Sequence, residues 1–268
     1  MPSDPAAEVL LPGGVANRGL VVRVGDTVRR PQRRTSPATH ALLQHLESTG
    51  FDGSPRFLGV DTQNREVLSY ISGDTVAPPY PSWVLTDETL RSVARLLLRY
   101  HQAVSTLDPS PYRWPPSPPD PYRGTLVTHN DPNLHNVIFR RGRAVAFIDF
   151  DLASPGSAVW DIAAATRLWS PLRNDDDITD SRRTRALPRF KLFVETYGLQ
   201  DYDPAELVRA VQLNHDWLYT LIRSEALTGN AGYIDYWRGA ADRVYRTRRW
   251  YAANHLRLTQ ALVADEPR

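Results

Sequence analysis

The spacing of apolar residues changes about a quarter of the way along the chain. Over the first 74 residues, short apolar runs alternate with turn pairs such as Gly25-Asp26, which predicts a small antiparallel sheet. One helix interrupts these strands, because SPATHALLQHLESTG places apolar residues at helical spacing, with Ser36 as N-cap and Gly50 as terminator. The prolines that follow Asp74 cannot extend a sheet. We therefore expect a first lobe over residues 1–74.

Helical spacing dominates the remaining residues, 75–268. Apolar residues recur at steps of three and four from Thr86 to Val104, and we expect a final long helix from about Tyr233 to Leu262. The exception is NVIFR and AVAFIDF, two short strands joined across Arg141-Gly142 as a hairpin, which follow a stiff proline-rich connection. These patterns predict an α+β fold with a strand-rich first lobe and a mainly helical second lobe.

The composition excludes several classes of protein but does not identify a binding partner. The 268 residues are 41% apolar, enough for a substantial core. The absence of cysteine excludes disulfides, thiolate zinc sites and a cysteine nucleophile. A formal charge of +2 gives no general attraction to nucleic acid or membrane, and neither a signal peptide pattern nor a long apolar run is present. We expect a cytoplasmic monomer or dimer that binds neither nucleic acid nor membrane.

The polar stretch VTHNDPNLHNVIF is the strongest candidate for chemistry. Asp131 and Asn136 lie five residues apart before the first hairpin strand, and Asp149 follows the second strand. The three side chains should therefore meet at the open end of the hairpin, which we call the hairpin rim. Carboxylate and amide oxygens without thiolates suit a hard cation such as Mg²⁺, which shares its remaining positions with substrate phosphates. Phosphoryl transfer needs this arrangement together with a free carboxylate that accepts the proton of the attacking alcohol.

The segments HNDPNLHN and AFIDFDLASPGSAVWDIA closely resemble the catalytic and metal-binding segments of the aminoglycoside phosphotransferase family, whose relatives include choline kinases and protein kinases. The resemblance implies a two-lobed protein-kinase-like fold and transfer of phosphate from ATP to a hydroxyl. It further implies that Asp131 is the catalytic base and that Asn136 and Asp149 are the Mg²⁺ ligands. Asp161 would anchor the catalytic loop, and His129 would orient that loop through hydrogen bonds.

The first lobe should then bind the nucleotide, ATP or alternatively GTP. The segment LPGGVANRG could supply backbone amides to the phosphates around Gly14, with Asn17 nearby. The family carries a basic residue in the third strand, for which Arg29 is our first choice and Arg30 the second. On the following helix, Thr39 or His40 stands where the family has a glutamate, so either another acid orients Arg29 or the nucleotide is held differently. The backbone from Ser69 to Ile71 should contact adenine.

The acceptor is expected to be a small hydroxylated molecule, such as an aminoglycoside or another amino alcohol. In the second lobe, Asp216 and Glu225 could bind its cationic groups, whereas the acidic run at 175–177 is typical of a solvated loop.

The main alternative is a non-catalytic nucleotide-binding module, suggested by the altered first lobe. A protein kinase is disfavoured, since the segment from Asp149 to Asp161 is too short for an activation loop. A metallohydrolase could use His129, Asp131 and His135, but no second histidine cluster follows.

Overall fold

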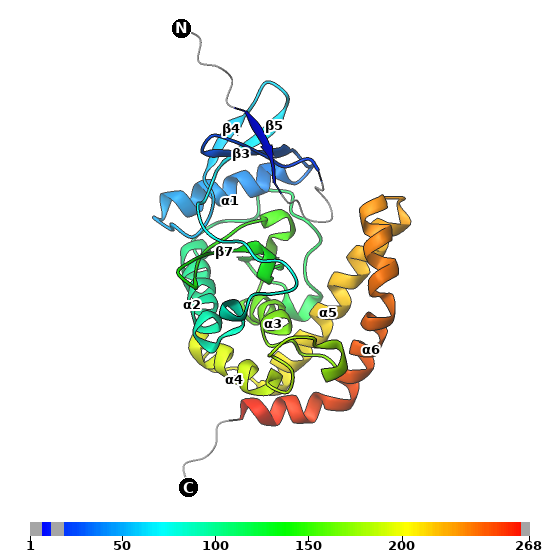
Figure 1. The fold of residues 1–268 in the computed structure, drawn as a ribbon. Helices are drawn as coiled ribbons and strands as arrows, with labels where there is room; N and C mark the ends of the chain where they lie inside the picture. The colour runs from blue at the N-terminus through cyan, green and yellow to red at the C-terminus, as the bar shows by residue number, and fades with distance from the viewer. Residues whose placement is uncertain (1–6, 12–18, 264–268) are drawn as a thin grey trace.

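A computed structural model describes residues 7–11 and 19–263. Its first lobe holds a five-stranded antiparallel sheet and one helix, as the sequence pattern predicts (Figure 1). The strands follow the order β1-β2-β3-β5-β4 across the sheet. The elements are β1 (Glu8–Leu10), β2 (Val22–Val24), β3 (Thr27–Pro31), α1 (Ser36–Ser48), β4 (Phe57–Val60) and β5 (Arg65–Ser69). Gly14 and Asn17 lie outside the described residues.

The N-cap of α1 lies one residue earlier than expected. Thr35 is the cap residue, and its carbonyl accepts the amide of Ala38. Ser36 is instead the first helical residue, and its hydroxyl accepts a hydrogen bond from the Arg33 amide. The expectation for Ser36 was therefore wrong by one position, because its side chain bonds back to the preceding turn rather than forward to the helix.

The second lobe is mainly helical, with two short antiparallel strand pairs. Its helices are η2 (Ser82–Leu85), α2 (Asp87–Val104), η3 (Asp120–Tyr122), η4 (Leu134–Asn136), η5 (Phe150–Leu152), α3 (Ala158–Trp169), η6 (Asp175–Asp177), α4 (Ala186–Tyr197), α5 (Pro204–Leu227) and α6 (Ala231–Leu262). Its strands are β6 (Leu126–Thr128), β7 (Val137–Arg140), β8 (Arg143–Phe147) and β9 (Ser154–Gly156); β6 pairs with β9 and β7 with β8. Within the described part of the chain, no helix is both long and apolar enough to span a membrane.

The two lobes are joined by backbone hydrogen bonds and by a common core. Asp74, the last residue of the expected first lobe, exchanges two backbone hydrogen bonds with Phe139 of β7, at 2.8 and 2.9 Å. The Gly53 carbonyl of the first lobe accepts the amide of Phe147 in β8 at 2.9 Å. One cluster of buried apolar residues runs from α1 through α2 to α6. The β7–β8 hairpin, which carries the candidate chemistry, is therefore held directly against the first lobe.

The helices α5 and α6 form a long hairpin along one side of the molecule. Figure 1 shows that this hairpin extends from the base of the second lobe toward the first lobe. Its lower part packs against α3 and α4. Asp216 and Glu225, the residues expected to bind the acceptor, both lie on α5 of this hairpin.

Candidate active site

The loop after β6 is fixed by one buried carboxylate. Asp161, in the first turn of α3, accepts the backbone amides of His129 and Asn130 at 2.7 and 2.8 Å. It also accepts a hydrogen bond from His101 Nε2 at 2.9 Å. Burial alone would raise the pKa of Asp161, but the hydrogen bond and charge of His101 hold it below the usual value. Asp161 therefore occupies the position that an anchor of the loop requires.

His129 orients the loop from inside the lobe. Its ring is fully buried, with Nε2 3.1 Å from the Ile148 carbonyl, while Nδ1 accepts the amide of Asp131 at 3.3 Å. Burial lowers the pKa of His129, so the neutral ring is favoured. Both ring nitrogens therefore have backbone partners.

Asp131 sits at the rim with its carboxylate held by two asparagines. One oxygen accepts Asn133 Nδ2 at 2.9 Å and the other accepts Asn136 Nδ2 at 3.0 Å. Burial raises the pKa of Asp131 to about 7, and the nearby charge of Asp149 adds to this effect. The Asn133 and Asn136 hydrogen bonds and the positive charge of Arg167 oppose it. A carboxylate that titrates near neutrality suits a general base.

Asn136 and Asp149 meet at the same rim, because the Asn136 carbonyl accepts the amide of Ile148 at 2.9 Å. Asn136 directs its amide nitrogen to Asp131, which leaves its amide oxygen for a cation. Asp149 adopts a left-handed backbone conformation with φ of 64°, and burial together with the charge of Asp151 raises its pKa to about 6.

These oxygens fit Mg²⁺. Among the described residues, no group of three or more histidine, cysteine or acidic side chains could hold a metal. One carboxylate and one amide oxygen are nevertheless sufficient for Mg²⁺, which retains waters and takes further oxygens from phosphates. A metallohydrolase centre at His129, Asp131 and His135 is not supported, since both histidines use their ring nitrogens for other contacts.

The cation that faces Asp149 is Arg30, so Arg29 was the wrong first choice. Successive residues of a strand point to opposite faces. Arg29 points away from the hairpin and pairs with Asp61 at 3.4 Å. Arg30 is buried and binds Asp149 at 3.1 Å and Asp151 at 2.8 Å. The second choice that the sequence offered, Arg30, is therefore the strand arginine that lies beside Asp149.

Glu66 takes the place of the expected helix glutamate. It lies directly opposite Arg30 in the β3–β5 register, and its carboxylate accepts Arg30 Nε at 2.6 Å. Its second oxygen lies 2.8 Å from His40 Nε2, and the His40 ring stacks on Phe57 with 3.7 Å between centroids. Thus α1 contributes His40, which contacts Glu66, and β5 supplies Glu66 as the acid that holds Arg30. This answers the question of which acid orients the strand arginine.

The backbone at the end of β5 is only partly open to a nucleotide. The Ser69 amide donates to the Arg56 carbonyl at 2.9 Å, and its hydroxyl accepts the Arg56 amide at 2.9 Å. The amide of Tyr70 donates to the Asp26 carbonyl at 2.8 Å. The sheet uses the Ser69 amide, so contact of this backbone with adenine stays a prediction for the other backbone groups from Ser69 to Ile71. Ile71, which lies beyond the strand, remains a candidate.

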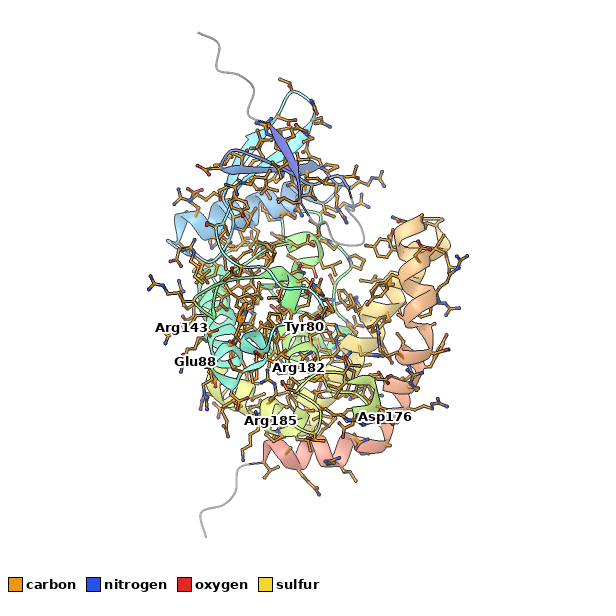
Figure 2. All side chains as sticks on the ribbon, in the orientation of Figure 1. Tyr80, Glu88, Arg143, Asp176, Arg182 and Arg185 are labelled. Carbon is orange, nitrogen blue, oxygen red and sulfur yellow. The ribbon has the colours of Figure 1, made fainter. Side chains whose placement is uncertain are left out.

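The segment after the lobe junction lies over the catalytic loop. His135 Nδ1 lies 3.1 Å from the Val76 carbonyl, and its Nε2 lies 3.2 Å from the Tyr80 hydroxyl. The Arg182 guanidinium is 5.4 Å from the centre of the Tyr80 ring, and both residues are labelled in Figure 2. His135 is therefore engaged with this segment through both ring nitrogens.

Asp216 and Glu225 do not form a common cation site. Asp216 accepts Arg248 Nε at 2.9 Å and lies 3.2 Å from His215 Nδ1, so its charge is compensated. Glu225 is exposed on the same helix, nine residues and about 14 Å further along. The acidic run forms η6 and pairs with surface arginines, as expected for a solvated segment: Asp176 with Arg183, and Asp177 with Arg246.

Comparison with known proteins identifies the family. Residues 112–193, which include the catalytic loop and the β7–β8 hairpin, match the model of the phosphotransferase enzyme family. The trifolitoxin immunity protein of Rhizobium leguminosarum bv. trifolii is 31% identical over 207 residues, which cover 72% of this chain and 74% of that protein. The chain belongs to the phosphotransferase enzyme family. The expectation of a small-molecule kinase is thereby confirmed.

Solved structures confirm the kinase-like fold of this phosphotransferase. The GDP complex of aminoglycoside 2'-phosphotransferase-IIIa superposes with a TM-score of 0.60 at 13% identity, covering 94% of this chain and 95% of that chain. A choline/ethanolamine kinase family protein from Mesorhizobium loti gives a TM-score of 0.59 at 14% identity, covering 90% and 88% of the two chains. At these identities the likeness concerns the fold alone.

Proposed function

We propose that this phosphotransferase transfers the terminal phosphoryl group of ATP, or alternatively GTP, to a hydroxyl of a small molecule, with Asp131 as base and Mg²⁺ held by Asn136 and Asp149. The observation that carries this proposal is the arrangement at the hairpin rim. There, a carboxylate with a pKa of about 7 is held by Asn133 and Asn136, close enough to Asp149 for their charges to interact. The nucleotide itself is inferred from family membership.

The side chains of the rim account for the steps that the protein must perform. The Asp131 carboxylate would accept the proton of the attacking hydroxyl while Asn133 and Asn136 keep its oxygens in place. Arg30, held by Glu66, presents its guanidinium to the same space as Asp149 and can bind phosphate with two parallel N–H groups. When bound, Mg²⁺ would neutralise charge on the phosphates.

The relative's name suggests a setting for such a reaction. That relative is named for immunity to trifolitoxin. For this chain we infer that phosphorylation of a small hydroxylated compound protects the cell from that compound, as in resistance to an antibiotic. The alternative of a non-catalytic nucleotide-binding module is motivated by Arg30, which already pairs with both Asp149 and Asp151.

Calorimetric titration of ATP and of GTP, with and without Mg²⁺, tests the proposal. We expect binding that requires Mg²⁺ in the native chain and is at least tenfold weaker in Asp149→Asn. Slow hydrolysis of the bound nucleotide, measured as released phosphate, separates an enzyme from a binding module. Absence of Mg²⁺-dependent binding to both nucleotides would overturn the proposal, and tight binding without any hydrolysis would favour the binding module.

A further inference from the structure

A cluster of arginines lines a small cavity between α3, α5 and α6. Arg167 comes from α3, Arg173 from the segment after α3, and Arg243 from α6. The cavity measures about 30 Å³, and since a water molecule needs roughly 10–15 Å³ by this measure, it has room for about two water-sized atoms. This is the size of the oxygens of one carboxylate or phosphate group rather than of a whole substrate.

The arginines of the cluster lack acidic partners. The neighbouring Arg182, Arg246 and Arg248 are each paired with an aspartate. In contrast, Arg167, Arg173 and Arg243 form no ion pair with an acid within residues 7–11 and 19–263. Arg167 is only 6% exposed, and its one hydrogen bond runs from Nε to the Asn214 side chain at 3.2 Å.

Other buried polar groups around the cavity also lack partners. Among the described residues, no hydrogen bond is made by Arg167 Nη2, Arg173 Nε, His215 Nε2 or the Tyr251 hydroxyl. His215 and Tyr251 are 2% and 1% exposed. The two arginine nitrogens and the Tyr251 hydroxyl can each donate a hydrogen bond, and unpaired buried donors and cations are costly. His215 Nδ1 donates to the Asp216 carboxylate, so its Nε2 is an acceptor in the neutral ring that burial favours. Together with the three guanidinium groups, these donors favour an acceptor that carries negative charge.

The cluster is close to the proposed catalytic base. Trp169, two residues after Arg167, donates its indole N–H to the Pro132 carbonyl at 2.8 Å, which ties α3 to the catalytic loop directly beside Asp131. The positive charge of Arg167 also reaches Asp131, where it lowers the pKa of that carboxyl. A molecule whose hydroxyl lies at Asp131 can thus extend toward the arginines.

We propose that the acceptor carries an anionic group, a carboxylate or a phosphate, which Arg167, Arg173 and Arg243 bind in this cavity. The inference rests on the proposed phosphotransferase function and names its substrate class. It replaces the expected amino alcohol, because an ammonium group would be repelled by three cations and the nearby Asp216 is already paired with Arg248. Arginine binds planar and tetrahedral oxyanions with paired N–H groups, which suits either anion.

Inorganic phosphate serves as the probe, and thermal unfolding of the full chain as the readout. The melting temperature is followed against phosphate concentration, with sodium chloride added to keep the ionic strength constant. Arg243→Gln and Arg173→Gln are compared with Arg238→Gln, an exposed arginine on the same helix α6 that pairs only with Asp235. Arg30→Gln is included because phosphate could instead bind in the nucleotide site.

We expect the apparent affinity for phosphate to fall at least tenfold in Arg243→Gln and Arg173→Gln and to change less than twofold in Arg238→Gln. If one variant does not fold, the other decides. Stabilisation that none of these changes affects, or that only Arg30→Gln removes, would overturn the inference. The test uses no ATP, so phosphate binding without Mg²⁺-dependent nucleotide binding would refute the proposed function while leaving the anion site standing.

Discussion

Asp131 is a partly buried carboxylate whose surroundings favour its protonated form. Burial raises its pKa to about 7, from an unperturbed value near 4. As a base Asp131 must be ionised, so we expect kcat/KM for phosphoryl transfer to rise tenfold per pH unit below about pH 7 and to level off above it.

Asp131→Asn should abolish turnover while changing the affinity for ATP less than twofold, because the carboxylate acts on the acceptor. Equal losses in turnover and affinity would contradict this role.

The same pKa predicts a dependence of stability on pH. The folded chain holds a proton on Asp131 that the unfolded chain has already released between about pH 4 and pH 7. The free energy of unfolding should therefore fall across this window relative to Asp131→Asn, which has no proton to lose. At pH 8 we expect the variant to be more stable by on the order of 4 kcal/mol, with little difference at pH 4, in urea unfolding.

The positions of single side chains were predictable where the residues lie close together in the chain. Asp131, Asn136 and Asp149 lie within one loop and one hairpin, so their convergence follows from strand geometry alone. The choice between Arg29 and Arg30 did not follow, because it depends on which face of β3 meets the second lobe. Glu66 was missed for a related reason, since its contact with Arg30 requires the register between two strands separated by a helix.

At the scale of elements, the two arginines of β3 point to opposite faces of the sheet and make ion pairs of different strength. Arg29 makes one partly exposed ion pair, which is worth at most about 1 kcal/mol. Arg30 compensates three acids that are mostly buried: Glu66, Asp149 and Asp151. Removing such a cation leaves uncompensated charge, at a cost of about 3–5 kcal/mol.

Arg30→Gln and Arg29→Gln therefore form a matched pair. We expect Arg30→Gln to lower the free energy of unfolding by about 3 kcal/mol and to weaken ATP binding at least tenfold. Arg29→Gln should change stability by less than about 1 kcal/mol and leave ATP affinity within twofold. Urea unfolding and calorimetry measure both quantities. If Arg29→Gln had the larger effect on ATP, the assignment made from the strand face would be wrong.

The helices of the second lobe show a similar limit of sequence reasoning. Periodicity predicted α2 and α6 closely, because each is long and amphipathic. It could not predict that Arg167 and Arg173 share a cavity with Arg243, since Arg243 on α6 lies far along the chain from both. An arginine on a helix normally indicates a solvated face. The cluster becomes visible only in the structure, where these three arginines line one cavity without acidic partners in the part of the chain that is described.

At the scale of the whole molecule, the two lobes depend on a short junction. Gly73 has a φ of 157° and precedes Asp74, whose two backbone hydrogen bonds with Phe139 join the first lobe to β7. A methyl group on Gly73 would lie 2.6 Å from the Phe139 carbonyl oxygen and 2.5 Å from Ile138 Cγ2. These atoms belong to the strand that follows Asn136, so a shift there would also displace the rim of the site.

Gly73→Ala should therefore lower the free energy of unfolding by about 1–3 kcal/mol and weaken Mg²⁺-dependent ATP binding, because the junction and β7 must move apart. Gly239→Ala in α6 is the control: a methyl there meets nothing within 4 Å, and alanine favours a helix by up to about 1 kcal/mol. Urea unfolding and ATP titration on both variants give the comparison. Reduced stability with unchanged nucleotide binding would show that the lobes tolerate displacement at this junction, whereas loss of both would tie the geometry of the rim to the contact between Asp74 and Phe139.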